Sequence, residues 1–283
     1  MTTQRVPTAT TTWVDGQQAD ALPLPDRALA YGDGLFETLL LAGQRITLQD
    51  YHFARLGEGL RRLGIPDCMT AVREQLAVAC KAVTHEHEFS VMRLTVSRGA
   101  GPRGYAPPTD AIPRIIITLA PLSANPWVLS SPADLGETAV RWGKQPLLAG
   151  IKHLNRLEQV LAAADCARSG HDEVLMLGQC GEPLSVTTGN LFVCLGDKLL
   201  TPQLCDAGIT GTRRQLIIEQ LGAACGLQVS EARLDVAQLL AADELFYCNT
   251  VVGLRPVSRF RHRRWLRHPV TSALHGAYVG WLA

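Results

Sequence analysis

The sequence predicts a two-domain α+β protein, and three observations support this class. Its 283 residues, 47% hydrophobic and 19% charged, provide enough apolar side chains for two cores. Helical and strand patterns both occur, but they do not alternate as a regular βαβ series would, so a Rossmann fold is not expected. The stretch 121–126 has the composition of a linker. We therefore expect an N-terminal domain over 1–120 and a C-terminal domain over 127–283.

Hydrophobic periodicity defines the elements expected in the first domain. Strands are predicted at 35–42, 45–48, 91–97 and 114–119, and helices at 49–63 and 70–83. The Gly/Pro-rich loop 99–113 joins the last two strands, and its length is typical of a functional loop rather than of a tight turn.

The second domain is expected to contain more strands than helices. Strands are predicted near 140 and at 173–177, 190–195, 198–201 and 245–249, and helices from near 154 to Gly170 and over 212–224. The first of these helices carries an apolar stripe formed by Leu154, Leu157, Val160, Leu161 and Ala164. Gly170 is expected to cap its C-terminus, since glycine readily adopts the left-handed conformation.

Charge and cysteine usage exclude several classes of function. The formal net charge of +1 provides no electrostatic basis for binding nucleic acid or an anionic membrane. The longest apolar run, 115–120, is too short to span a bilayer, and the N-terminus lacks a signal-peptide pattern. Eight scattered cysteines indicate reduced thiols in a cytoplasmic protein. The His85-Glu86-His87 run is more typical of a solvated turn than of a metal site, so we expect no metal.

One lysine in the run 150–160 is a candidate nucleophile. The run places Lys152 just before the helix that begins near Leu154. Burial disfavours the ammonium form, and a neutral lysine amine can attack an aldehyde and form a Schiff base. For an isolated lysine, a solvated position at a helix start would be the simpler interpretation.

Further motifs give this lysine its significance. They are Trp13–Gly16, Asp26–Ala28, Tyr31–Thr38, His52–Leu56, Ser97–Tyr105, Gly189–Phe192, Asp206–Gly211 and Cys248–Thr250. Their order resembles that of the fold-type-IV pyridoxal-phosphate enzymes, from about Trp13 to Val257. This superfamily includes aminodeoxychorismate lyases and the D-amino-acid and branched-chain aminotransferases. The 152–160 run and Arg103-Gly104-Tyr105 are similar to the lyase branch.

The resemblance implies a fold and an activity. The fold would be a small N-terminal α/β domain followed by a larger, β-barrel-like C-terminal α/β domain that binds pyridoxal 5'-phosphate. The activity would be conversion of 4-amino-4-deoxychorismate to 4-aminobenzoate and pyruvate, a step of folate biosynthesis. A homodimer is implied, with the loop 99–113 completing the neighbour's site. The alternatives are a D-amino-acid or branched-chain aminotransferase and a cofactor-binding protein with little catalysis.

The resemblance also implies roles for individual residues. Lys152 would hold the cofactor as an internal aldimine and act as the general base. The phosphate would be bound by Arg55, by the amides of Ile209 and Thr210 at a helix start, and by the Thr250 hydroxyl. The substrate's carboxylate and hydroxyl groups would be bound by Tyr31, Arg103 and Tyr105. Taken singly, each has a simpler interpretation as a solvated or packed side chain.

Ser185 departs from the family pattern. Many relatives have a glutamate five residues before Asn190, where it pairs with the pyridine nitrogen of the cofactor; here the position is Ser185. A hydroxyl carries no charge and stabilises a pyridinium less well than a carboxylate does. Glu182 would need a different loop path to substitute for it. The substitution argues more against a transaminase than against a lyase, because aromatisation of the product drives the lyase reaction.

Overall fold

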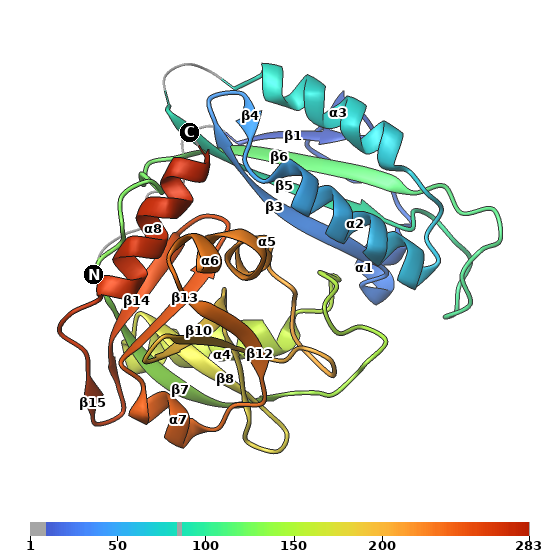
Figure 1. The fold of residues 1–283 in the computed structure, drawn as a ribbon. Helices are drawn as coiled ribbons and strands as arrows, with labels where there is room; N and C mark the ends of the chain where they lie inside the picture. Colours follow the sequence, from blue (N-terminus) through green and yellow to red (C-terminus); the bar gives the residue numbers. More distant parts are fainter. Residues whose placement is uncertain (1–9, 84–86, 283) are drawn as a thin grey trace. The chain divides into compact units, whose positions relative to one another are not determined.

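The computed structural model describes residues 10–83 and 87–282, which form two compact units (Figure 1). Unit 1 comprises the chain up to Asn125 together with Lys152–Asn155, and unit 2 comprises Pro126–Ile151 and the chain from Arg156 onward. The expected boundaries assigned 152–155 to the second domain. The structure differs because the backbone of these four residues is hydrogen-bonded to β3 of unit 1.

Unit 1 is built on one antiparallel sheet with strand order β2-β1-β6-β5-β3-β4. The strands are β1 (Thr11–Val14), β2 (Gln17–Gln18), β3 (Gly34–Ala42), β4 (Arg45–Ile46), β5 (Phe89–Ser97) and β6 (Arg114–Leu122). The helices are α1 (Arg27–Tyr31), α2 (Gln49–Leu63) and α3 (Met69–Lys81), and α2 packs on β3 while α3 packs on β6. Strand β3, which lies between β5 and the edge strand β4, is buried along most of its length and contributes much of the core of the unit.

Unit 2 contains a nine-stranded mixed sheet with the main order β12-β11-β10-β13-β14-β7-β8-β9. Its strands are β7 (Ala133–Trp142), β8 (Glu173–Gly178), β9 (Pro183–Val186), β10 (Asn190–Leu195), β11 (Lys198–Pro202), β12 (Gln228–Ala232), β13 (Glu244–Asn249), β14 (Gly253–Phe260) and β15 (Arg263–Arg264). The last strand in the order, β9, also contacts β10 and β11 near the other end. The sheet therefore curls on itself, and the expected barrel-like second domain is confirmed.

Helices of unit 2 cover this sheet. They are α4 (Leu157–Ser169), α5 (Thr212–Leu216), α6 (Gly222–Ala224), α7 (Val236–Ala241) and α8 (Pro269–Leu282), with a π-helical turn η1 (Ile217–Leu221) between α5 and α6. The helix predicted over 212–224 is thus present but includes a wider turn. The Gly170 cap is confirmed, with φ +73° and its amide donating to Cys166 O.

The apolar stripe of α4 does not pack as a core face. Leu157, Val160 and Leu161 are 77%, 59% and 58% exposed, whereas Ala162 is fully buried. The helix also begins at Leu157 instead of near Leu154, because the residues before it are bound to β3. Periodicity correctly predicted a helix here, but this chain alone does not cover its apolar side.

No helix of the described residues is long and apolar enough to cross a membrane. Within 10–83 and 87–282, no three His, Cys, Asp or Glu side chains are grouped to hold a metal ion. His85 and Glu86 of the His85-Glu86-His87 run lie outside the described residues.

Candidate active site

Backbone hydrogen bonds fix the segment that carries Lys152. In unit 1, the amide of Phe36 donates to Lys152 O at 2.9 Å, and the amide of Leu154 donates to Gly34 O at 3.1 Å. The Lys152 Nζ lies 4.2 Å from the centre of the Phe36 ring. An aromatic face stabilises an ammonium at this distance. Lys152 is partly exposed, so its amine is directed by Phe36 and is not sealed in the core.

The turn 206–211 in unit 2 has the glycines that a close approach requires. Gly208 has φ +97°, which disfavours other residues. A Cβ on Gly211 would lie 2.0 Å from Asn190 Oδ1, so a side chain is excluded there. Asn190 also donates to Ile209 O at 2.9 Å and thereby holds the turn at the start of α5.

The backbone amides of Ile209 and Thr210, the two predicted donors to the phosphate, point in opposite directions. The Thr210 amide donates to Gly150 O at 3.0 Å, and the Gly150 amide donates to Gly208 O at 2.9 Å. The Thr210 amide is therefore engaged within the protein, contrary to the expectation that it binds phosphate. In this ladder the amide of Ile209 faces away from Gly150, toward the side where Asn190 binds Ile209 O.

Thr250 lies in the turn between β13 and β14. The Asn249 side chain accepts the amides of Val251 and Val252 at 2.9 and 2.8 Å, which closes the turn around Thr250. Asn190 is paired in register with Cys248, at the end of β13. The side chain of Asn190 thus holds one turn while its backbone lies beside the strand that leads into the other.

Ser185 is a buried polar side chain without a protein partner. It lies on β9 opposite Met176, is 4% exposed, and its Oγ has no hydrogen-bond partner among the described residues. Leaving such a hydroxyl unsatisfied costs about 1–3 kcal/mol, which a bound group can recover. Glu182 is directed elsewhere: it accepts the Cys180 amide at 2.9 Å and lies 3.6 Å from Lys144 Nζ.

Arg55 belongs to a buried ionic cluster with His52 and Glu37. Its Nε donates to Glu37 Oε1 at 2.8 Å and its Nη2 to Glu37 Oε2, while His52 Nδ1 lies 2.7 Å from Glu37 Oε2. Burial raises the pKa of Glu37, but the charge of Arg55 and the hydrogen bond with His52 outweigh this and lower the pKa to about 2. Glu37 is therefore ionised at neutral pH and orients the guanidinium.

The predicted substrate residues lie in and beside the loop 99–113 of unit 1. The Tyr31 hydroxyl accepts the Gly104 amide at 3.0 Å, and the Tyr31 and Tyr105 rings are 5.5 Å apart. Tyr105 is 87% exposed and Arg103 is also exposed, so both are accessible to a ligand. Tyr31 thus contacts the backbone between the two other predicted residues.

The motifs that contain Glu37, Asn190 and Arg27 were named from the sequence, but these three residues were assigned no role. Each acts on another candidate, since Glu37 orients Arg55, Asn190 holds the 209–211 turn, and Arg27 binds the loop of Arg103. A charged residue within a motif, such as Glu37 in the largely apolar stretch 35–41, was the sequence signal that could have revealed Glu37 and Arg27.

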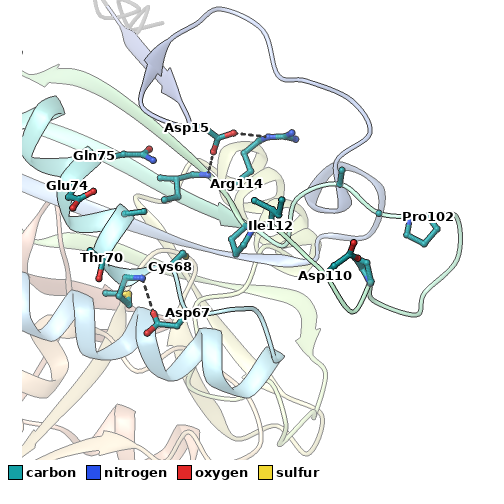
Figure 2. Close-up of a pocket in the computed structure, with 17 residues that line it drawn as sticks. Asp15, Asp67, Cys68, Thr70, Glu74, Gln75, Pro102, Asp110, Ile112 and Arg114 are labelled. Carbon is teal, nitrogen blue, oxygen red and sulfur yellow. Dashed lines mark hydrogen bonds and ion pairs between the residues drawn. The ribbon is translucent and has the colours of Figure 1, made fainter.

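A separate open cleft of about 1040 Å³ lies in unit 1, between the start of α3 and the loop 99–113 (Figure 2). Its wall includes Asp15, which binds the Arg114 side chain and the Ile115 amide. None of the predicted site residues lines it. The cleft is therefore separate from the residues predicted to bind cofactor and substrate.

Comparison with known proteins points to one family. Residues 34–260 match the model of amino-transferase class IV. The chain is 33% identical over 251 residues to an aminodeoxychorismate lyase of Vibrio harveyi, covering 87% of this chain and 90% of that protein. It is 26% identical to a D-alanine aminotransferase of Listeria monocytogenes, covering 90% and 89%. Among solved structures, 4-amino-4-deoxychorismate lyase from Pseudomonas aeruginosa is similar with a TM-score of 0.87 and 40% identity, covering 94% and 97%.

Proposed function

The chain belongs to the amino-transferase class IV family, and we propose that within this family it is an aminodeoxychorismate lyase. It would convert 4-amino-4-deoxychorismate to 4-aminobenzoate and pyruvate with pyridoxal phosphate, as a step of folate biosynthesis. The similarity to named lyases over nearly the whole chain supports this assignment.

The residues present suit a phosphate-bearing aldehyde cofactor. Gly208 supplies the positive φ of the turn before α5 and Gly211 lets that turn pack against Asn190, while the Ile209 amide is the candidate donor to the phosphate. The buried Ser185 hydroxyl is available to accept or donate a hydrogen bond at the ring nitrogen. Arg55 would add a charge-assisted bond to the phosphate, and Thr250 a hydroxyl.

Lys152 would carry the proton transfers. When bound, pyridoxal phosphate supplies an electron sink that acidifies the C4–H bond of the substrate ring. The neutral Lys152 amine then removes the C4 proton and can return it to the oxygen of the departing enolpyruvate, which becomes pyruvate. The Phe36 ring stabilises Lys152 during the interval in which it holds that proton.

Arg103, Tyr105 and Tyr31 would recognise the substrate. The substrate is an amino dicarboxylate, and the planar fork of Arg103 suits a carboxylate. Tyr31 and Tyr105 would add hydroxyl donors from the two sides of Gly104.

Ser185 is the observation that favours a lyase over an aminotransferase. Its neutral hydroxyl cannot hold a positive charge on the ring nitrogen as a carboxylate does, so the electron sink is weaker. An aminotransferase must stabilise a carbanion long enough to reprotonate it. The lyase instead gains an aromatic ring as enolpyruvate leaves, so its carbanion need not persist.

We also propose a cytoplasmic homodimer. The eight cysteines are all free thiols in the structure, which suits a reducing compartment. Leu157, Val160 and Leu161 expose an apolar stripe on α4 that a second copy would cover.

The test supplies the purified protein with 4-amino-4-deoxychorismate and measures 4-aminobenzoate and pyruvate, which should appear in equal amounts. Amino-group transfer from D-alanine or a branched-chain amino acid to 2-oxoglutarate is measured in parallel. Faster transfer than cleavage would overturn the lyase proposal in favour of an aminotransferase. Cofactor binding without either reaction would leave only a binding protein.

A further inference from the structure

Arg27, the first residue of α1, is a buried arginine whose side chain lies inside the loop 99–113. Its Nη2 donates to Tyr105 O at 2.8 Å, and its Nη1 donates to Gly104 O at 3.1 Å and to Ala106 O at 3.4 Å. One guanidinium thus binds three consecutive carbonyls of the loop. These three residues adjoin or include the predicted substrate residues Arg103 and Tyr105.

The rest of the loop is shaped around the same side chain. The Arg27 amide donates to Gly99 O at 2.9 Å, at the beginning of the loop. A Cβ on Gly101 would lie 2.9 Å from Arg27 Cδ, so glycine leaves the space that the arginine stem occupies. The loop backbone therefore follows Arg27 from Gly99 to Ala106.

Asp33 fixes the direction of the guanidinium. Its Oδ2 accepts Arg27 Nε at 2.8 Å and also Arg98 Nε at 2.8 Å. Burial raises the pKa of Asp33, but hydrogen bonds and charges from Arg98 and Arg27 outweigh this and lower it. Asp33 is thus a charged acceptor, and Arg27 is held at its Nε edge while its outer nitrogens bind the loop.

Tyr31 completes a clamp on Gly104. The Arg27 guanidinium lies 4.8 Å from the centre of the Tyr31 ring, and the Tyr31 hydroxyl accepts the Gly104 amide. Gly104 therefore has its carbonyl bound by Arg27 and its amide bound by Tyr31. With φ +104°, it is in a conformation that residues with side chains rarely adopt.

We infer that Arg27 is a positioning residue for substrate binding: it orders the loop so that Arg103 and Tyr105 are presented in one arrangement. The identity of the substrate in this inference rests on the proposed function. Arg27 acts through the loop backbone and makes no bond to the reacting atoms. If the loop were ordered one-tenth of the time, the apparent affinity for substrate would fall about tenfold.

Arg27→Lys removes the fork but retains the charge. We expect hydrogen exchange of the amides over 103–106 to become about tenfold faster, and the KM for 4-amino-4-deoxychorismate to rise about tenfold. The turnover number and the affinity for pyridoxal phosphate should stay within about twofold, because the chemistry and the cofactor do not contact Arg27 in this account.

Arg98→Lys is the matched control. Arg98 is similarly buried and shares Asp33, but its other bonds go to Leu63 O and Gly64 O at the end of α2. Its exchange effect should fall on the end of α2 and not selectively on 103–106. A purely structural role for Arg27 would accelerate exchange throughout unit 1 in both variants.

Unchanged exchange over 103–106, or an unchanged KM, in Arg27→Lys would overturn the inference. If that variant does not fold, Gly101→Ala tests the inference instead. Its added methyl group lies in the loop and would push the Arg27 side chain out of its position. It should accelerate exchange over 103–106 in the same way, and no change would again overturn the inference. If the wild type does not cleave 4-amino-4-deoxychorismate, the proposed function fails, whereas the exchange measurements still decide whether Arg27 orders the loop.

Discussion

Glu37→Gln tests the buried cluster that orients Arg55. The change keeps the shape of the side chain but removes the negative charge that pairs with both Arg55 and His52. Glu37 is 1% exposed and the Arg55 side chain 9%, so water does not replace the lost carboxylate. Removing one partner of a buried ion pair costs about 3–5 kcal/mol.

The pKa of Glu37 gives an independent magnitude. It is lowered from 4.5 to about 2. Each tenfold change in proton affinity is worth about 1.4 kcal/mol, so the ionised carboxylate stabilises the fold by about 3 kcal/mol. Because the folded-state pKa is depressed, this contribution is fully present above pH 4.5 and is lost as the pH falls toward 2.

Urea unfolding from pH 7 to pH 3, followed by circular dichroism, measures both effects. Glu37→Gln should lower the free energy of unfolding by about 3 kcal/mol at pH 7. The difference from wild type should shrink below pH 4.5, because Glu37 then takes up a proton in the unfolded wild-type chain while it stays ionised in the folded one. Glu58→Gln is the control on α2, the helix that carries Arg55, since the Glu58–Arg61 pair is solvent-exposed, and it should change stability little. A constant difference at all pH values, or none at pH 7, would refute the reasoning.

Four further outcomes test the site. Lys152→Ala should abolish turnover and the fixation of pyridoxal phosphate by borohydride; a reducible cofactor in this variant would exclude Lys152 as its attachment point. Thr250→Val should weaken cofactor affinity about tenfold with little effect on the chemical step, measured by cofactor titration. Arg103→Ala should raise KM or lower turnover without changing cofactor affinity, and unaltered kinetics would make the loop purely structural. Ser185→Glu should raise side transamination more than cleavage, provided that cofactor occupancy is unchanged; an equal increase in both rates would contradict the proposed role of Ser185.

The sequence predicted elements whose signal is local. The helix over 49–63 and the Gly170 cap follow from residue spacing and from the left-handed conformation of glycine, and both are present. The segment 152–155 was assigned to the wrong unit because the hydrogen bonds that attach it to β3 join backbone atoms. A backbone hydrogen bond to a distant strand leaves no mark on side-chain periodicity.

The exposure of the α4 stripe and the bond of the Thr210 amide were missed for related reasons. Hydrophobic periodicity predicts that Leu157, Val160 and Leu161 share one side of a helix, but it does not predict what covers that side. The motif 206–211 predicted a turn at a helix start, and the structure contains one. Which of its amides faces outward depends on the bridge to Gly150, which is 58 residues from Gly208 in the chain and is not predictable from the motif itself.

The acidic residues of the N-terminal motifs each bind an arginine. Asp26 accepts the Ser97 hydroxyl at 2.7 Å and the Arg114 guanidinium at 2.6 Å, Asp33 accepts Arg27, and Glu37 accepts Arg55. All three carboxylates lie within twelve residues, yet each holds an arginine from a different segment or turn. Since a buried carboxylate is stable only while it is paired, losing any one of them would release its arginine as well. We therefore interpret these three carboxylates as structural residues that hold the loop 99–113 and α2 in place. Through these segments they position the side chains proposed to bind substrate and phosphate.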